Sequence, residues 1–95
     1  MYEVIVTVAG ADGSVETFTL NLVSQLEFEE IETVGSLLEA FIKGISRKHE
    51  LRLAWLAYKQ EGRTVPADLK AFAAQIKSVD AKLEKAPFGE AGPTA

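Results

Sequence analysis

Residues 2–22, YEVIVTVAGADGSVETFTLNL, determine which part of the chain forms a sheet. Residues 2–8 are rich in β-branched side chains, and residues 15–22 alternate polar and apolar side chains; both patterns are typical of β-strands. Between these segments, Asp12 and Gly13 are a turn signal. The sequence therefore predicts an N-terminal antiparallel β-hairpin.

The length of the hairpin loop decides which side chains share a face. A two-residue turn at 12–13 would place the valines of residues 4–8 opposite polar side chains. An odd-numbered loop, such as residues 12–14 with glycine in the left-handed conformation, would place them on the face of the apolar side chains of residues 18–22. We favour the odd loop, because it gives the hairpin a single apolar face that can pack on the rest of the chain.

About four helices are expected after the hairpin. Ser24 and Ser36 are each followed three residues later by glutamate, which forms a capping box, and Ser46 suits the same role. Pro66 suits the first turn of a last helix, and Pro87 follows its end. The expected helices span about residues 25–34, 37–44, 47–61 and 66–86, the last with apolar residues at helical spacing from Leu69 through Phe72, Ala73, Ile76 and Val79 to Leu83.

Gly35 decides whether the first two helices are separate. A glycine directly before a new cap favours a break there. A continuous helix is the alternative, since it would align a seam with coiled-coil spacing. The seam would consist of Phe28, Ile31, Gly35, Leu38, Ile42 and Ile45.

Together these patterns predict an α+β fold that is mostly helical, with the N-terminal antiparallel β-hairpin followed by about four α-helices. The chain has 95 residues, which suits one small domain. We expect this domain to span residues 1–86 and residues 87–95, PFGEAGPTA, to form a mobile C-terminal tail. Because a small domain buries a limited share of its surface, a partner or self-association would add stability.

Charge and composition exclude several kinds of partner. Ten Lys and Arg against fourteen Asp and Glu give a net charge of −4, so we expect no binding to nucleic acid. No apolar stretch has the length of a membrane span, and no cysteine is present for a disulfide or a thiolate metal site. We expect a soluble, cytoplasmic protein that does not bind a membrane.

Candidates for catalysis or metal binding are few. His49 lies among charged residues at the start of a helix, and we expect it on a solvated surface. The acidic residues Glu27, Glu29, Glu30 and Glu32 lack the spacing of a calcium loop, and we expect them on a solvated face. No nucleophile motif or phosphate-binding loop is present. The sequence therefore predicts no enzyme, no catalytic residue, no metal site and no cofactor.

The expected helix at 37–44 offers the candidate binding site, because it is apolar on two sides. Leu37 and Phe41 lie on one side, whereas another side carries Leu38, Ile42 and Ile45. A small protein rarely covers both sides of a short helix, so one stripe is available for a partner. We predict that Val34, Leu37 and Phe41 bind a partner, with a place in the core as the alternative for Phe41.

Residues 24–80 resemble the tail assembly chaperones of long-tailed bacteriophages, which are small proteins encoded just before the tape measure gene. Three segments carry the resemblance, and the N-terminal hairpin is not part of it. They are FEEIETVGSLLEAF at 28–41, LRLAWLAYKQEGR at 51–63 and TVPADLKAFAAQIKSVD at 64–80.

The resemblance implies a non-catalytic role in assembly. Such a protein would bind the long, aggregation-prone tape measure protein in the host cytoplasm and assist the tail tube protein in polymerising around it. It would be absent from the mature virion, and it could form a homo-oligomer. The alternative is a small structural virion or connector protein that stays in the particle.

Overall fold

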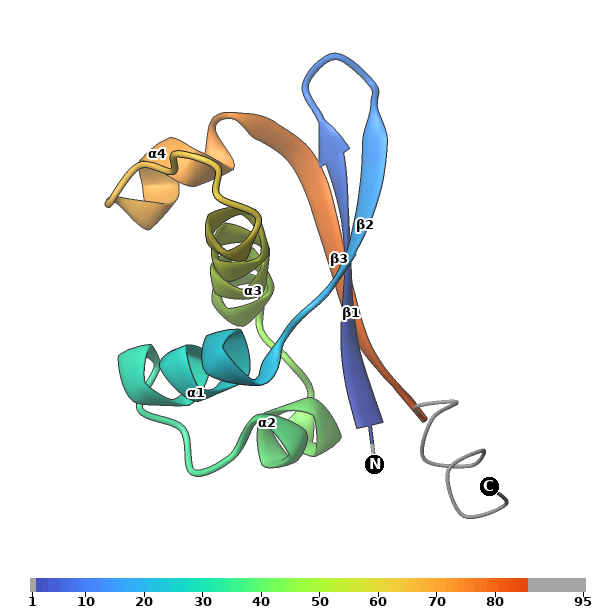
Figure 1. The fold of residues 1–95 in the computed structure, drawn as a ribbon, viewed down its shortest axis with the longest axis vertical. Helices are drawn as coiled ribbons and strands as arrows, with labels where there is room; N and C mark the ends of the chain where they lie inside the picture. The colour runs from blue at the N-terminus through green and yellow to red at the C-terminus, as the bar shows by residue number, and fades with distance from the viewer. Residues whose placement is uncertain (1, 86–95) are drawn as a thin grey trace.

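The computed structural model describes residues 2–85, and the tail predicted at 87–95 lies outside them. Within these residues the chain forms a sheet and a layer of helices that covers one face of it (Figure 1). The elements in chain order are β1 (Tyr2–Gly10), β2 (Val15–Thr19), α1 (Leu22–Ile31), α2 (Leu37–Lys43), α3 (Arg47–Gln60), α4 (Leu69–Ala73) and β3 (Ile76–Lys85).

The sheet has the strand order β2-β1-β3, and both pairs are antiparallel. β1 is therefore the central strand, and the last described segment lies beside the first. The valines at positions 4, 6 and 8 of β1 face the helices and are at most 1% exposed. The largest fully buried side chains on the helices are Phe28 of α1, Leu53 and Leu56 of α3, and Phe72 of α4, with α3 between α1 and α4 (Figure 1).

The predicted hairpin and the parity of its loop are confirmed. Val6 pairs with Phe18, so the inward valines share a face with the apolar side chains of β2. The amide of Gly10 donates to the carbonyl of Ser14 at 2.7 Å, which encloses a three-residue loop at 11–13. Gly13 has a φ of 91°, a conformation that glycine adopts at no steric cost. The loop thus starts one residue before the predicted example.

The start of α1 differs from the prediction. Asn21, not Ser24, is the cap, and its side chain accepts a hydrogen bond from the Ser24 amide at 2.8 Å. Leu22 therefore begins the helix instead of ending β2. Ser24 is buried, and its hydroxyl donates to Oε1 of Gln60 at 2.8 Å. Residues 24–27 have the sequence of a capping box, but the Ser24 side chain bonds to α3 and does not cap α1.

The break at Gly35 is confirmed, because α1 ends at Ile31 and α2 begins at Leu37. The hydroxyl of Ser36 accepts a hydrogen bond from the Glu39 amide at 3.0 Å, as the capping pattern predicts. Ser46 caps α3 in the same way, through the amide of His49 at 3.1 Å. These two serines fix where the second and third helices begin.

The prediction of a mostly helical fold is wrong, because the last predicted helix is largely a strand. α4 ends at Ala73 and residues 76–85 form β3, so the described residues 2–85 are 43% helical and 29% strand. Beyond residue 76 the side chains also alternate with a period of two: Val79 and Ala81 are buried and Asp80 is exposed. Pairing with β1 satisfies the backbone groups of an otherwise open sheet edge, and this tertiary contact overrides the helical spacing.

Substitution of Ala81 tests the third strand. Ala81→Asp would bury a carboxylate without a partner, so we expect the free energy of unfolding to fall by about 3 kcal/mol or more in urea denaturation. Ser78→Asp is the matched control, because Ser78 is exposed on the same strand; we expect a change within about 0.5 kcal/mol. A helix continuing from α4 would turn Ala81 away from the core, so tolerance of Ala81→Asp would contradict the strand.

Candidate functional site

Glu32 is a buried charged residue at the end of α1, where the turn to α2 begins. It caps the C-terminal end of α1, and only 2% of its side chain is exposed. Its backbone amide donates to the carbonyl of Phe28 at 2.9 Å, which closes the last turn of the helix. The negative end of the helix dipole repels a carboxylate at the C-terminal end of a helix. The charge of Glu32 must therefore be stabilised by groups from another element.

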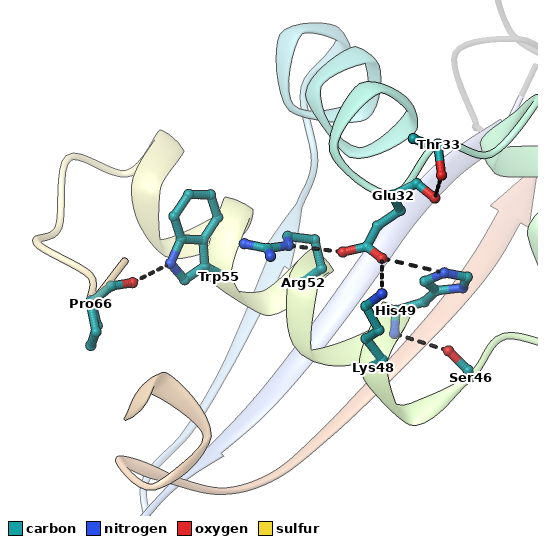
Figure 2. A network of polar contacts seen from close by, with 8 residues as sticks. All are labelled: Glu32, Thr33, Ser46, Lys48, His49, Arg52, Trp55 and Pro66. Carbon is teal, nitrogen blue, oxygen red and sulfur yellow. Dashed lines mark hydrogen bonds and ion pairs between the residues drawn. The ribbon is translucent and has the colours of Figure 1, made fainter. Parts of the chain in front are cut away.

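Three basic side chains from the first turns of α3 surround this carboxylate (Figure 2). Nε of Arg52 donates to Oε2 at 3.0 Å. Nζ of Lys48 lies 3.2 Å from Oε1, and Nε2 of His49 lies 3.6 Å from the same oxygen. Neither contact to Oε1 has the geometry of a hydrogen bond, so the charge of Lys48 is what compensates this oxygen. We call Glu32 with Lys48, His49 and Arg52 the Glu32 clamp.

The clamp lowers the pKa of Glu32 below its ordinary value of 4.5. Burial on its own raises the pKa, because it disfavours the charged form. The contacts and positive charges of Arg52 and Lys48 together outweigh burial. Glu32 is therefore ionised at neutral pH, and the clamp is an ion pair between α1 and α3.

The prediction that His49 and Glu32 lie on solvated surfaces is wrong for both residues. Glu32 is buried, and the side chain of His49 is 23% exposed. The imidazole packs edge-on against the ring of Phe28, with 5.4 Å between ring centroids. These contacts join segments that are far apart in sequence, which local spacing does not reveal.

A second polar junction holds the opposite end of α1. Oε1 of Gln60, at the end of α3, accepts a hydrogen bond from the backbone amide of Asn21 at 3.0 Å and another from the Ser24 hydroxyl at 2.8 Å. The amide nitrogen of Gln60 donates to the carbonyl of Thr19 at 2.8 Å. The start of α1 thus lies at the end of α3, and the Glu32 clamp joins the end of α1 to the start of α3. The two helices are antiparallel and α1 is held at both ends.

This attachment determines which face of α1 points outward. Phe28 faces the core and is fully buried. Leu22, Val23 and Leu26 lie on the opposite side, because their positions are turned by roughly half a helical turn from Phe28. They are 74%, 65% and 60% exposed. We call these three residues the outer face of α1.

α2 adds a second exposed apolar row. Leu38 and Ile42 are separated by four residues, which places them on one side of the helix, and they are 44% and 75% exposed. Ile31 at the end of α1 is 42% exposed. Among the described residues, six of the eight large apolar side chains that are exposed belong to α1 or α2, which are neighbours at one end of the helical layer (Figure 1).

Of the three residues predicted to bind a partner, Leu37 and Phe41 lie on the inner side of α2 and Val34 lies in the turn before it. Leu37 is buried at 4% exposure. Val34 and Phe41 are half-buried and pack against the core. The other side of the same helix, with Leu38 and Ile42, is the exposed one. The sequence identified a helix with two apolar sides, and the fold turns the selected side inward.

Residues 2–85 contain no group of three or more His, Cys, Asp or Glu that could hold a metal ion. In the same residues, no helix combines the length and the apolar content that crossing a membrane requires. Comparison of the chain with models of protein families, with curated proteins and with solved structures found no match.

Glu32→Gln tests whether the clamp stabilises the fold. The substitution keeps the size of the side chain but leaves Arg52 and Lys48 without a counter-charge, so we expect the free energy of unfolding to fall by about 2 kcal/mol. Glu30→Gln, on the exposed side of the same helix, is the control and should change it by less than about 0.5 kcal/mol. Equal effects of the two substitutions in urea denaturation would contradict the clamp.

The stability from Glu32 is expected to depend on pH. Because folding lowers the pKa of Glu32 below 4.5, its contribution is complete above that pH and is lost as the pH falls through the folded pKa. The difference in unfolding free energy between wild type and Glu32→Gln should therefore be constant near neutral pH and vanish in acid. Urea denaturation at a series of pH values measures it, and a difference that grows in acid would contradict the assignment.

Proposed function

We propose that this protein is a non-catalytic tail assembly chaperone of a long-tailed bacteriophage, which binds the tape measure protein and assists assembly of the tail tube. Two independent observations support the proposal. One is the resemblance of residues 24–80 to these chaperones. The other, which carries the proposal, is the exposed apolar surface on α1 and α2. Small monomeric domains rarely expose such clusters unless they bind something.

The arrangement of the apolar residues suits a helical partner. Leu22 and Leu26 are four residues apart and Val23 and Leu26 are three apart, so they form one continuous ridge on α1. An amphipathic helix recognises such a ridge through its own apolar stripe. A tape measure protein with long helices would offer many stripes of this kind along its length.

The outer face of α1 needs no rearrangement before it binds. Because α1 is held at both ends by polar contacts to α3, its apolar ridge is exposed in the folded protein. Binding therefore requires little ordering, and release leaves a folded protein. The net charge of −4 would help to keep the complex in solution until assembly. These properties fit a reversible role in the host cytoplasm.

Leu26→Asp tests the binding surface. The protein would be co-expressed with the tape measure protein of the same phage, and the soluble fraction of that protein would be measured. Loss of a side chain that binding buries costs about 1.5–3 kcal/mol, so we expect affinity to fall by roughly one to two orders of magnitude and the soluble fraction to drop. Because Leu26 is exposed, thermal denaturation of the variant should match wild type.

Val15→Asp is the matched control, because Val15 is 65% exposed but lies on β2. It should keep the tape measure protein soluble. Equal loss in both variants, or no loss in Leu26→Asp, would contradict the proposed surface. Mass spectrometry of purified particles separates the two candidate roles, since a chaperone should be absent from them and a structural component present.

A further inference from the structure

Glu30 lies at the end of the apolar ridge on α1. It follows Leu26 by four residues and Val23 by seven, so it continues the outer face toward the C-terminal end of the helix. The residue is exposed, and its side chain forms no hydrogen bond or ion pair with any described residue. The ridge therefore ends in an uncompensated negative charge.

The neighbouring glutamates differ from Glu30 because each has a partner within the fold. Oε2 of Glu27 lies 3.4 Å from Nζ of Lys59. Oε2 of Glu29 accepts a hydrogen bond from the Leu37 amide at 2.7 Å. Glu32 belongs to the clamp. Three of the four carboxylates of this acidic run are thus paired within the fold, whereas Glu30 lies beside the exposed apolar residues.

The charges of α1 and α2 favour a cation at this end of the ridge, and the nearby Lys48 and Arg52 of α3 are engaged by Glu32. α1 contains no Lys or Arg, and its C-terminal end carries the negative end of the helix dipole. On α2, the exposed Lys43 is already close to Glu39, with 3.9 Å between Nζ and the carboxylate. No basic side chain of α1 or α2 is therefore available to compensate Glu30.

From this geometry we infer that the partner segment is an amphipathic helix whose apolar stripe ends in Lys or Arg, and that this basic end lies against Glu30. The inference rests on the proposed role of the outer face of α1 as the binding surface, and adds the chemistry of its partner. The apolar stripe supplies affinity. The ion pair with Glu30 selects among helices that offer similar stripes and fixes which end of the stripe lies at the end of α1.

Two synthetic amphipathic helices test this inference. They share one apolar stripe and differ only in ending on lysines or on glutamates, and fluorescence anisotropy measures their binding to the full-length protein. We expect wild type to bind the lysine peptide about threefold to tenfold more tightly, which is the range of exposed ion pairs and repulsions. The ratio should approach one at high salt, because salt screens exposed charges.

Charge variants assign the preference to a residue. Glu30→Lys should remove or invert the preference, whereas Asp80→Lys should keep it. Asp80 is the matched control, because it is exposed on the face of the sheet away from the helices. Both substitutions lie on the surface, and equal melting temperatures would show that neither disturbs the fold.

The outcomes separate this inference from the proposed function. Equal binding of both peptides that Leu26→Asp abolishes would keep the binding surface and overturn the role of Glu30. Binding that Leu26→Asp leaves unchanged, or no binding of either peptide, would overturn both. Self-association of wild type in sedimentation, lost in Leu26→Asp and not displaced by the lysine peptide, would assign the surface to a second copy and overturn the inference.

Discussion

The Glu32 clamp is the interaction on which the arrangement of the helices depends. Taking a carboxylate out of water is costly, and the structure compensates for it with the positive charges of Lys48 and Arg52 from one segment of α3. This requirement fixes the position of α1 at one end, and Gln60 fixes it at the other. With both ends held, Phe28 enters the core and the outer face of α1 stays in solvent. A polar contact thus determines where apolar surface is presented.

The local parts of the fold could be predicted from the sequence, because local chemistry specifies them. Asp12-Gly13 with flanking β-branched residues gives the hairpin, and Ser36 and Ser46 give the starts of α2 and α3. The third strand could not be predicted in this way. Residues 69–83 satisfy a period of 3.6, and their second half also satisfies a period of two. The choice between these patterns depends on the free edge of β1, which lies about 70 residues earlier in the chain.

The candidate site was only partly predictable. The sequence indicates that the helix at 37–43 is apolar on two sides, but it does not indicate which side Leu37 or Leu38 occupies relative to the sheet. Glu32 looks like one more residue of an acidic run, because its partner Arg52 is 20 residues away. The outer face of α1 was missed because the segment at 22–26 was divided between the end of a strand and the start of a helix. Asn21, a strong capping residue, was the signal that could have placed it.

The solvent exposure of the leucine and valine methyl groups on α1 can be measured in solution, and it decides whether the apolar ridge faces outward. In NMR spectra recorded with a soluble paramagnetic probe, probe contact broadens the signals of methyl groups that face solvent. We predict strong broadening for Leu22, Val23 and Leu26, and sharp signals for Leu37 and Leu53. Protected methyl groups at Leu22, Val23 and Leu26 in the monomer would contradict it, because α1 would then be rotated and its apolar ridge would belong to the core.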